Sequence, residues 1–213
     1  MEGDGRLYLN AMVETAQQND LSLEAIRAGD RAEFARLVDL YSAPIYRLAL
    51  RILGEPRDAE DVLQETFIKA YRHLKEFEGR SSISTWLYRI ASNEAFMLLR
   101  KRKPEALSVD EEISTVDGER EPVQIEDWCC LPEAEFLSAE SREHLDLAVD
   151  NLSSALKTVF MLRDIEGLSV RETADALHIS EAAVKTRLLR ARLQLREELS
   201  QYYGERLKEV KQA

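Results

Sequence analysis

The chain of 213 residues is poor in several residue types, and each shortage excludes a class of protein. Its two cysteines, Cys129 and Cys130, are adjacent and far in sequence from every histidine, so they indicate neither a disulfide framework nor a metal site. No apolar run approaches the ~18 residues of a membrane span, and the acidic start is unlike a signal peptide. No catalytic spacing or phosphate loop occurs. We expect a cytoplasmic protein that is not an enzyme, with no cofactor, no metal and no membrane insertion.

Basic side chains are also outnumbered, since 29 Lys and Arg residues stand against 40 Asp and Glu residues and the formal net charge is −11. The excess of negative charge is confined to one segment. Residues 104–143 contain 13 acidic and 2 basic side chains, while the rest of the chain has equal numbers of acidic and basic side chains. Between Pro104 and Pro132 the apolar periodicity fades and Pro, Gly, Asp and Glu accumulate, which is typical of a linker. Near-neutral domains with local basic surfaces are therefore expected on both sides of an acidic connector.

Helical periodicity on both sides of this connector predicts the fold class. Phe34, Leu37, Tyr41 and Ile45 recur at helical spacing, and no alternating strand pattern of any length appears. The sequence thus predicts an all-α protein with two small helical domains joined by a flexible acidic linker. Its expected parts are an N-terminal extension (1–20), a first domain (21–103), the linker (104–135), a second domain (136–203) and a C-terminal tail (204–213).

The most informative stretch is a predicted helix-turn-helix at Ser169–Arg192. Ser169 and Glu172 have the spacing of a capping box, which begins a short helix. His178 interrupts that helix, and Ser180 can cap a longer one that runs towards Leu199. Histidine tolerates the left-handed conformation that such a turn requires.

A helical wheel divides the second of these helices into two faces. An apolar stripe is expected to face the core: Val184, Leu188, Ala191 and Leu195. The outward face begins small, becomes basic and carries exposed leucine: Ala182, Ala183, Thr186, Leu189, Arg190 and Leu193, with Lys185 at its edge. A helix in the DNA major groove needs small residues for close approach, cations for phosphate and guanine, and apolar contacts for thymine methyls. The alternative is a solvated basic face on an ordinary core helix.

The first domain contains a helix with a mixed outer face, predicted at residues 58–74. Its buried side is expected to hold Leu63, Phe67, Ala70 and Leu74. The opposite side gathers acidic, amide, apolar and basic side chains: Asp61, Gln64, Glu65, Ile68 and Arg72. An exposed isoleucine ringed by polar groups favours a docking surface for a protein, although a solvated face with one stray apolar residue fits the pattern equally well.

A second helix of this domain, predicted at residues 85–103, ends in four cations and follows a loop at residues 77–85. We expect its buried side to hold Trp86, Leu87, Ile90, Ala91, Met97 and Leu98. The opposite side would hold Arg89, Ser92, Asn93, Phe96 and Arg100. Aromatic and hydroxyl groups beside a basic helix suit the exposed bases of single-stranded DNA. The cations could instead only complement the helix dipole.

In this order the segments resemble the extracytoplasmic-function (ECF) sigma factors of bacterial transcription. The segment DAEDVLQETFIKAY (58–71) looks like the polymerase-binding helix of that family. The segments FEGRSS (77–82) and TWLYRIA (85–91) with Asn93 look like its −10 reader. The segment LSSALKTVF (152–160), with DIEGL (164–168) and the helix-turn-helix, looks like its −35 domain. The resemblance covers roughly residues 20–200 and makes 21–103 sigma region 2 and 136–203 sigma region 4.

The resemblance and the helix faces together give site residues at three places. The resemblance implies contacts of Asp61, Gln64 and Glu65 to the clamp of the largest subunit of core RNA polymerase, and the same helix face adds Ile68 and Arg72. For melted −10 DNA the resemblance implies Phe77, Ser81, Ser82, Ile83 and Asn93, and the outer face of the helix adds Arg89 and Arg100. Contacts to −35 duplex fall on Lys185, Thr186, Arg187, Leu189 and Arg190. Since Arg187 points away from the outward face, it is assigned to phosphate rather than to a base edge.

The family also implies promoter DNA and an anti-sigma factor as partners, and a linker placed in the RNA path of the polymerase. About 30 extended residues span up to ~100 Å, enough to separate two domains on a large enzyme. The acidity of the linker fits either mimicry of nucleic acid or simple solubility. Two other functions stay open at this point: a stand-alone helix-turn-helix regulator, and an adaptor that binds a protein but no DNA.

Overall fold

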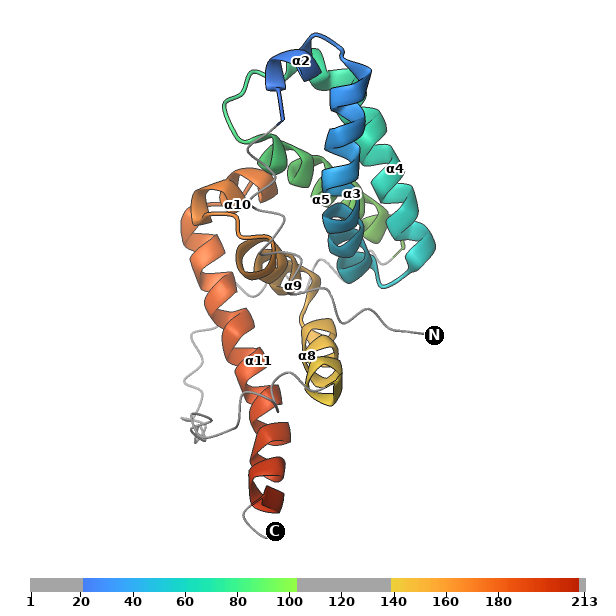
Figure 1. The fold of residues 1–213 in the computed structure, drawn as a ribbon. Coiled ribbons are helices and arrows are strands. Elements are labelled where there is room, and N and C mark those ends of the chain that lie inside the picture. Colours follow the sequence, from blue (N-terminus) through green and yellow to red (C-terminus); the bar gives the residue numbers. More distant parts are fainter. Residues whose placement is uncertain (1–20, 103–138, 211–213) are drawn as a thin grey trace.

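The computed structural model describes residues 21–102 and 139–210, and within them every regular element is a helix (Figure 1). The expected all-α fold class is confirmed. The first domain contains α2 (Leu23–Arg27), α3 (Arg31–Leu53), α4 (Pro56–His73), the 3-10 turn η2 (Leu74–Glu76) and α5 (Ile83–Arg102). The second contains α8 (Ala139–Asn151), α9 (Ser154–Phe160), the π-helical turn η4 (Met161–Ile165), α10 (Val170–Leu177) and α11 (Glu181–Val210).

Several sequence predictions concern segments outside the described residues. These are the N-terminal extension, the acidic linker (104–135) with Cys129 and Cys130, and the last three residues of the tail. In the described residues, no helix combines the length and the apolar character that crossing a membrane requires.

Local signals begin and end the helices of the first domain where the sequence indicates. The Asp30 side chain caps α3, accepting hydrogen bonds from the backbone N–H groups of Ala32 at 2.8 Å and Glu33 at 3.2 Å. Gly54 ends the same helix in the left-handed conformation with φ 71°, and Pro56 then begins α4. The domain is therefore a set of antiparallel helices in which α3, α4 and α5 pack on one another.

The buried side of α5 differs from the one the wheel predicted. Leu87 and Ala91 are buried as expected, but Met97 is 44% exposed and Ser92, placed outside, is 1% exposed. The difference arises because α5 packs against α3 and α4 and also against α10 of the second domain. Contacts on several sides bury the small side chains Ser92 and Ala95, and a wheel based on hydrophobicity places such residues poorly.

The helix-turn-helix agrees with its prediction in detail. Ser169 and Glu172 form the capping box, and His178 takes the left-handed conformation with φ 55°. Ser180 Oγ accepts a hydrogen bond from the Ala183 backbone N–H at 3.1 Å, which caps α11. The predicted stripe of α11 is buried: Val184, Leu188, Ala191 and Leu195 are 0%, 7%, 0% and 5% exposed. The helix continues beyond Leu199 to Val210, because Gly204 weakens a helix without ending it.

The two domains lie side by side, with α10 packed along α5 and α9 against α3 (Figure 1). Buried side chains of both domains form one continuous apolar core, in which Leu87 and Ala91 of α5 belong with Ala176 of α10 and Leu162 of η4. The arrangement places the helix-turn-helix beside the loop and helix predicted to read the −10 element.

Candidate nucleic-acid and protein interfaces

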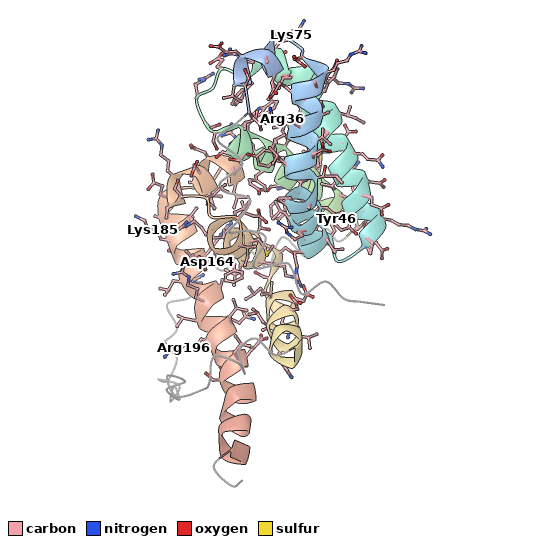
Figure 2. All side chains as sticks on the ribbon, viewed as in Figure 1. Arg36, Tyr46, Lys75, Asp164, Lys185 and Arg196 are labelled. Atoms are coloured by element: carbon pink, nitrogen blue, oxygen red, sulfur yellow. The ribbon has the colours of Figure 1, made fainter. Side chains whose placement is uncertain are left out.

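The outward face of α11 is accessible in the described arrangement. Lys185, Thr186 and Leu189 are exposed, Leu189 to 59%, and Arg187 and Arg190 are partly buried. Figure 2 shows Lys185 on the outer side of α11, away from the first domain. The five residues predicted for the −35 contact therefore lie along one helix, and three of them are open to solvent.

A small core and an ion pair fix the direction of this face. Val184 and Leu188 pack with Val159 of α9 and Ala174 of α10 in an apolar cluster separate from the main core. One turn beyond Leu188, Arg192 donates to both carboxylate oxygens of Asp164 in η4, at 2.9 and 2.6 Å. A two-point contact of this kind restricts rotation of the helix more than a single hydrogen bond does.

The carboxylate of Glu172 holds the first turn of the helix-turn-helix together. Its Oε2 accepts from the Ser169 backbone N–H at 2.9 Å, while Ser169 Oγ accepts from the Glu172 N–H at 3.1 Å. The hydrogen bond from the Ser169 backbone is the main cause of a pKa for Glu172 below its ordinary value. Glu172 thus favours its charged form, which keeps the capping box closed at neutral pH.

The residues predicted for the −10 contact divide into exposed and buried ones. Ser82, Asn93 and Arg100 are exposed, and Ser81 and Arg89 are partly buried. Phe77 and Ile83 lie in the core, 5% and 8% exposed. In this arrangement neither of those two side chains is available to a base, so a DNA contact by them stays a prediction and their observed role is packing.

Ser82 has a structural role beside the predicted one. Its Oγ accepts from the Thr85 backbone N–H at 3.1 Å and lies 2.8 and 2.7 Å from the hydroxyls of Ser84 and Thr85. The serine and threonine run before α5 therefore forms the N-terminal cap of that helix, which explains the hydroxyl-rich composition of the loop.

Trp86, expected on the buried side of α5, instead lines two surface crevices. Its ring centroid lies 5.1 Å from that of Phe77. One crevice, of about 470 Å³, joins Trp86 to Ser81 and Arg89. The other, of about 360 Å³, joins Trp86 to Asn93. An aromatic ring at a surface crevice is the type of group on which unpaired bases stack in other proteins.

The predicted polymerase contacts lie on the exposed side of α4 and continue onto α5. A groove of about 340 Å³ between the two helices is lined by Asp61, Val62, Gln64, Glu65, Ile68, Glu94, Met97, Leu98 and Lys101. We call this set the docking groove. Ile68 and Met97 are 42% and 44% exposed within it, and Lys69 bridges the two helices at its edge, 2.6 Å from Glu94 and 3.6 Å from Glu65. Arg72 is exposed near the end of α4, outside the groove.

The half of the docking groove that α5 contributes is not predicted by the sequence pattern. Because Met97 and Leu98 are apolar, hydrophobicity alone places them on the buried side of α5. The usable signal was that Glu94 falls within the same stripe, which a fully buried face does not tolerate without a partner. Lys69 of α4 is that partner.

Comparison with known proteins decides the family. The model of "Sigma-70 region 2" matches residues 37–105 and that of "Sigma-70, region 4" matches residues 142–195. The ECF RNA polymerase sigma factor SigW of Bacillus subtilis is 37% identical over 177 residues, covering 83% of this chain and 94% of that protein. The chain belongs to the ECF sigma factors of the sigma-70 family. The sigma-H factor of Pseudomonas aeruginosa is also similar to this sigma factor, with 35% identity over 84% of the chain and 92% of that protein.

Solved structures agree with the fold of this sigma factor. The sigma factor RpoE of Bartonella quintana, in complex with the anti-sigma factor NepR, superposes with a TM-score of 0.57 and 24% identity, covering 78% of this chain and 96% of that one. CnrH, in complex with the cytosolic domain of CnrY, gives 0.55 and 24%, covering 88% and 95%. Both structures are similar to this chain in the arrangement of their helices, that is, in the fold.

Membership of the family confirms the function expected from the resemblance. The chain is a transcription initiation factor, which binds core RNA polymerase and directs it to promoters by reading −35 duplex and melted −10 DNA. The alternative of a stand-alone helix-turn-helix regulator is thereby set aside, because region 2 accompanies the helix-turn-helix in the same chain.

Proposed function

We propose that this sigma factor performs its function through three surfaces. The docking groove with Arg72 binds core polymerase, the loop and helix from Phe77 to Arg100 hold melted −10 DNA, and the outward face of α11 reads −35 duplex. Residues 21–103 act as region 2 and residues 136–203 as region 4. The observation that carries this proposal is the α11 face, where exposed Leu189, Thr186 and Lys185 lie opposite a buried apolar stripe.

The α11 face has the chemistry of a major-groove reader. The small side chains of Ala182 and Thr186 allow the beginning of the helix to approach the DNA closely. Because Thr186 Oγ1 donates to the Ala182 carbonyl at 3.0 Å, the methyl group of Thr186 is left for an apolar contact. Lys185 supplies a cation for phosphate or guanine, and exposed Leu189 suits thymine methyls. Burying that leucine against DNA removes an apolar side chain from water, which favours binding.

The docking groove has the chemistry of a protein interface. Ile68 and Met97 give it an apolar floor, and Asp61 and Glu65 give it an acidic rim. Apolar centres within polar rims are typical of protein interfaces. The matching surface on the polymerase is expected to be an apolar ridge flanked by basic side chains. The ridge would pack against the apolar floor, and the basic side chains would pair with the acidic rim.

Catalysis of RNA synthesis belongs to the polymerase in this proposal, and the sigma factor contributes binding energy alone. Melting then results from preferential binding of an extruded −10 base, which offsets the few kcal/mol of unstacking. A factor of this kind acts in the cytoplasm, where core polymerase and the chromosome are. An anti-sigma factor is its proposed regulator, because the structurally similar sigma factor RpoE of Bartonella quintana was solved in complex with the anti-sigma factor NepR.

Run-off transcription with purified core polymerase tests the proposal. A pool of genomic fragments serves as template, with and without the sigma factor, and transcripts are sequenced to find their start sites. We expect start sites that share two sequence elements and that depend on the added protein. An absence of any protein-dependent start site would overturn the proposal, and it is the outcome expected of an adaptor that no longer binds DNA.

Two variants test which surface binds DNA and which binds polymerase. Lys185→Ala with Arg190→Ala is expected to abolish the start sites while leaving the affinity for core polymerase unchanged in a pull-down. Ile68→Asn is expected to lower that affinity. If the α11 double variant lowered polymerase binding instead, the division of labour between the two surfaces would be wrong.

A further inference from the structure

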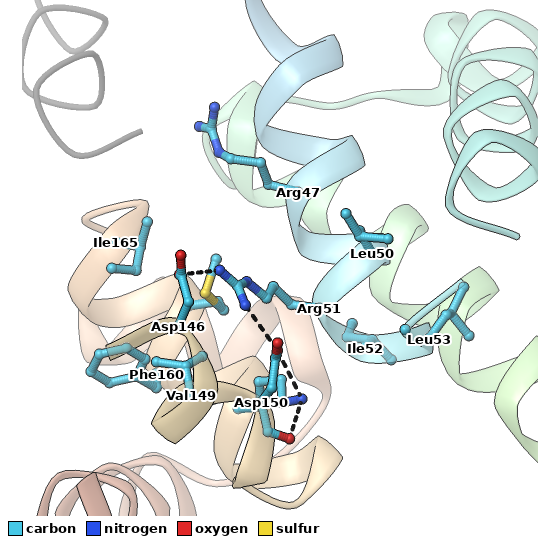
Figure 3. A pocket seen from close by; sticks show the side chains of 13 residues that line it. Arg47, Leu50, Arg51, Ile52, Leu53, Asp146, Val149, Asp150, Phe160 and Ile165 are labelled. Atoms are coloured by element: carbon cyan, nitrogen blue, oxygen red, sulfur yellow. Dashed lines mark hydrogen bonds and ion pairs between the residues drawn. The ribbon is translucent and has the colours of Figure 1, made fainter. Parts of the chain in front are cut away.

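A cavity of about 620 Å³ lies between the end of α3 and the helices α8, α9 and η4 (Figure 3). Its apolar wall includes Leu50 and Leu53 of α3, Val149 of α8, Phe160 of α9 and Ile165 of η4. The volume falls in the range of about 300–1,000 Å³ that is typical of small-molecule sites. The residues assigned above to polymerase and to DNA lie elsewhere, so this cavity is not used by the proposed function.

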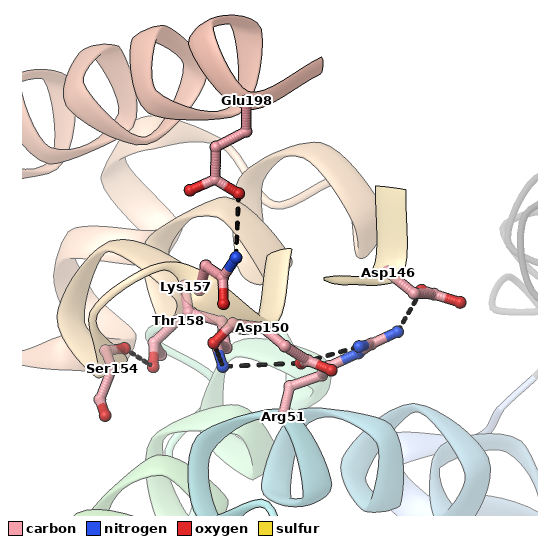
Figure 4. A network of polar contacts seen from close by, with 8 residues as sticks. Arg51, Asp146, Asp150, Ser154, Lys157, Thr158 and Glu198 are labelled. Atoms are coloured by element: carbon pink, nitrogen blue, oxygen red, sulfur yellow. Dashed lines mark hydrogen bonds and ion pairs between the residues drawn. The ribbon is translucent and has the colours of Figure 1, made fainter. Parts of the chain in front are cut away.

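Charged side chains gather at one side of the cavity. Arg51 reaches from α3 to the carboxylates of Asp146 and Asp150 on α8, and its Nη1 lies 2.8 Å from Asp150 Oδ1 (Figure 3). Lys157 of α9 lies beside the same aspartate (Figure 4). The cavity therefore combines an apolar wall with a charged edge, the division of surface that an amphipathic ligand requires.

Lys157 is only partly compensated by the groups around it. Its Nζ donates to the backbone carbonyl of Asp150 at 3.0 Å, while Asp150 Oδ1 lies 3.6 Å away, which is too long for a hydrogen bond. That same carboxylate oxygen already accepts a hydrogen bond from Arg51. An ammonium group carries three donors, so this arrangement leaves capacity for a further acceptor.

Burial makes this edge of the cavity favourable to an anion. Two cations face two carboxylates, but Asp146 and Asp150 are 39% and 52% exposed and remain hydrated, whereas the Lys157 side chain is 11% exposed. Desolvation by burial is the main cause of a pKa for Lys157 below its ordinary value. A carboxylate placed next to this ammonium would replace the water that burial has removed.

The other cation of the cavity has a carboxylate partner of its own. Arg47 of α3 donates to Glu166 Oε1 at 3.4 Å, and Tyr88 of α5 donates to Glu166 Oε2 at 2.7 Å. The side chain of Glu166, which follows η4, is 6% exposed. Because Glu166 already serves Arg47, we expect the head group of a ligand at Lys157 rather than at Arg47.

We propose that this cavity binds an amphipathic organic anion, with one carboxylate that pairs with Lys157 and a hydrocarbon body that lies against Leu50, Phe160 and Ile165. A single negative charge fits best, because a doubly charged phosphate would also face the carboxylates of Asp146 and Asp150. The ligand class is thus that of free medium-chain carboxylic acids. Burial of the hydrocarbon supplies affinity, and the ion pair fixes the orientation.

Titration of the full chain with decanoate, below the concentration at which it forms micelles, tests the site. Isothermal titration calorimetry is expected to show one saturable site. Octanoate should bind about 15-fold more weakly, since each buried methylene contributes about fourfold. 1-Decanol keeps the hydrocarbon without the charge and should bind at least about tenfold more weakly than decanoate. The absence of saturable binding up to about 1 mM decanoate would overturn the proposal.

Two variants test the two halves of the site. Lys157→Met keeps an aliphatic side chain without the ammonium, and should weaken decanoate binding at least about tenfold while 1-decanol binding stays unchanged. Lys75→Met, at an exposed lysine of η2, is the matched control. Leu53→Trp fills the cavity from α3 with Lys157 in place and should abolish binding of both compounds. It decides the question if Lys157→Met does not fold, which circular dichroism reveals. Native decanoate affinity in a folded Leu53→Trp variant would overturn the proposal.

Methyl NMR distinguishes the cavity from other apolar surfaces. Decanoate should shift the methyl signals of Val149 and Ile165 and leave those of Ile68 and Leu189 unchanged. Shifts confined to Ile68 and Leu189 would show non-specific binding to exposed apolar side chains and would contradict the assigned site.

A membrane is the other source of acyl chains with an anionic head group. Flotation with phosphatidylglycerol vesicles is expected to leave the protein unbound, because the apolar wall of the cavity lies between helices rather than on an outer face. Flotation that Lys157→Met abolished would assign the site to a lipid surface and would overturn binding of a free acid.

Discussion

The carboxylate of Asp58, in the first turn of α4, is buried beneath the guanidinium of Arg102 at the end of α5, whose Nη2 donates to Oδ1 at 2.6 Å. The two side chains differ sharply in exposure, 5% for Asp58 and 53% for Arg102. The pair joins the beginning of one helix of the docking groove to the end of the other. It therefore adds a link between the two helices to their apolar packing.

The unequal burial predicts unequal costs of removing each partner. Arg102→Met leaves a buried carboxylate without its ion-pair partner and is expected to cost about 1–3 kcal/mol in the free energy of unfolding. Asp58→Asn leaves a guanidinium that water can hydrate and should cost less than about 1 kcal/mol. Urea denaturation of both variants measures the difference, and equal costs would contradict the assigned burial.

Two adjacent leucines of α11 are expected to behave in opposite ways. Leu188 is 7% exposed in the small core of the helix-turn-helix, so Leu188→Ala should cost about 2–4 kcal/mol of stability. Leu189 is 59% exposed, and Leu189→Ala should change stability by less than about 0.5 kcal/mol. Thermal denaturation gives the stabilities. Promoter binding with polymerase should be weakened by Leu189→Ala, and a Leu189 variant with native affinity would exclude an apolar contact to DNA there.

Arg187 and Arg190 provide a test of base reading against phosphate binding. Arg190→Ala is expected to cost about 1–3 kcal/mol at the cognate −35 element and to relax the preference at one base pair. Arg187→Ala should weaken binding to all sequences alike and reduce the slope of log affinity against log salt by about one. Affinities of the holoenzyme for a set of single-base −35 variants, at several salt concentrations, distinguish the two. If Arg187→Ala relaxed the base preference and Arg190→Ala weakened binding to all sequences alike, Arg187 would be the residue that reads a base and Arg190 the one that binds phosphate.

The capping box gives the helix-turn-helix a predictable dependence on acid. Because the folded pKa of Glu172 is lowered, its stabilising effect is complete above the ordinary glutamate pKa near 4.5 and is lost as the pH falls through the lowered folded value. Glu172→Gln should therefore flatten the fall in unfolding free energy below about pH 4.5. Urea midpoints from pH 3 to 7 check this, with exposed Glu181→Gln as the control. Ser169→Ala should cost about 1 kcal/mol at neutral pH.

The two exposed apolar residues of the docking groove are expected to contribute together to polymerase binding. Ile68→Asn and Met97→Asn should each weaken binding to core polymerase about tenfold, which corresponds to about 1.4 kcal/mol. Leu147→Asn replaces an apolar side chain that is 55% exposed on α8 and is the matched control. Fluorescence anisotropy of labelled sigma factor with purified core polymerase measures all three. Equal effects of Leu147→Asn and Met97→Asn would show that α5 contributes no specific contact.

Features encoded within a short stretch of chain could be predicted from the sequence. The capping box, the left-handed His178 and the buried stripe of α11 depend on residues a few positions apart, and all three were confirmed. The buried side of α5 was wrong in part because the packing of α4 and α10 decides it. Met97, apolar yet exposed, shows that hydrophobicity alone does not assign a side in a helix with several neighbours.

The contacts between the domains could not be predicted at all. Tyr88 and Glu166 are 78 positions apart, and neither carries a local pattern that indicates the other. In the sequence Glu166 belongs to a segment that resembles region 4 as a whole, and Tyr88 to one that resembles the −10 reader. Only the three-dimensional arrangement reveals that the second domain binds the side of α5 that the first was expected to offer to DNA.

The continuous apolar core described for the two domains has a consequence for how the molecule unfolds. Leu87 and Ala91 share that core with Ala176 and Leu162, so the molecule with its two domains packed together is expected to melt in one cooperative transition. Once the domains separate, each retains its own core and loses the shared contacts. Two separate unfolding transitions would then replace one, so the cooperativity of unfolding reports whether the two domains share a core.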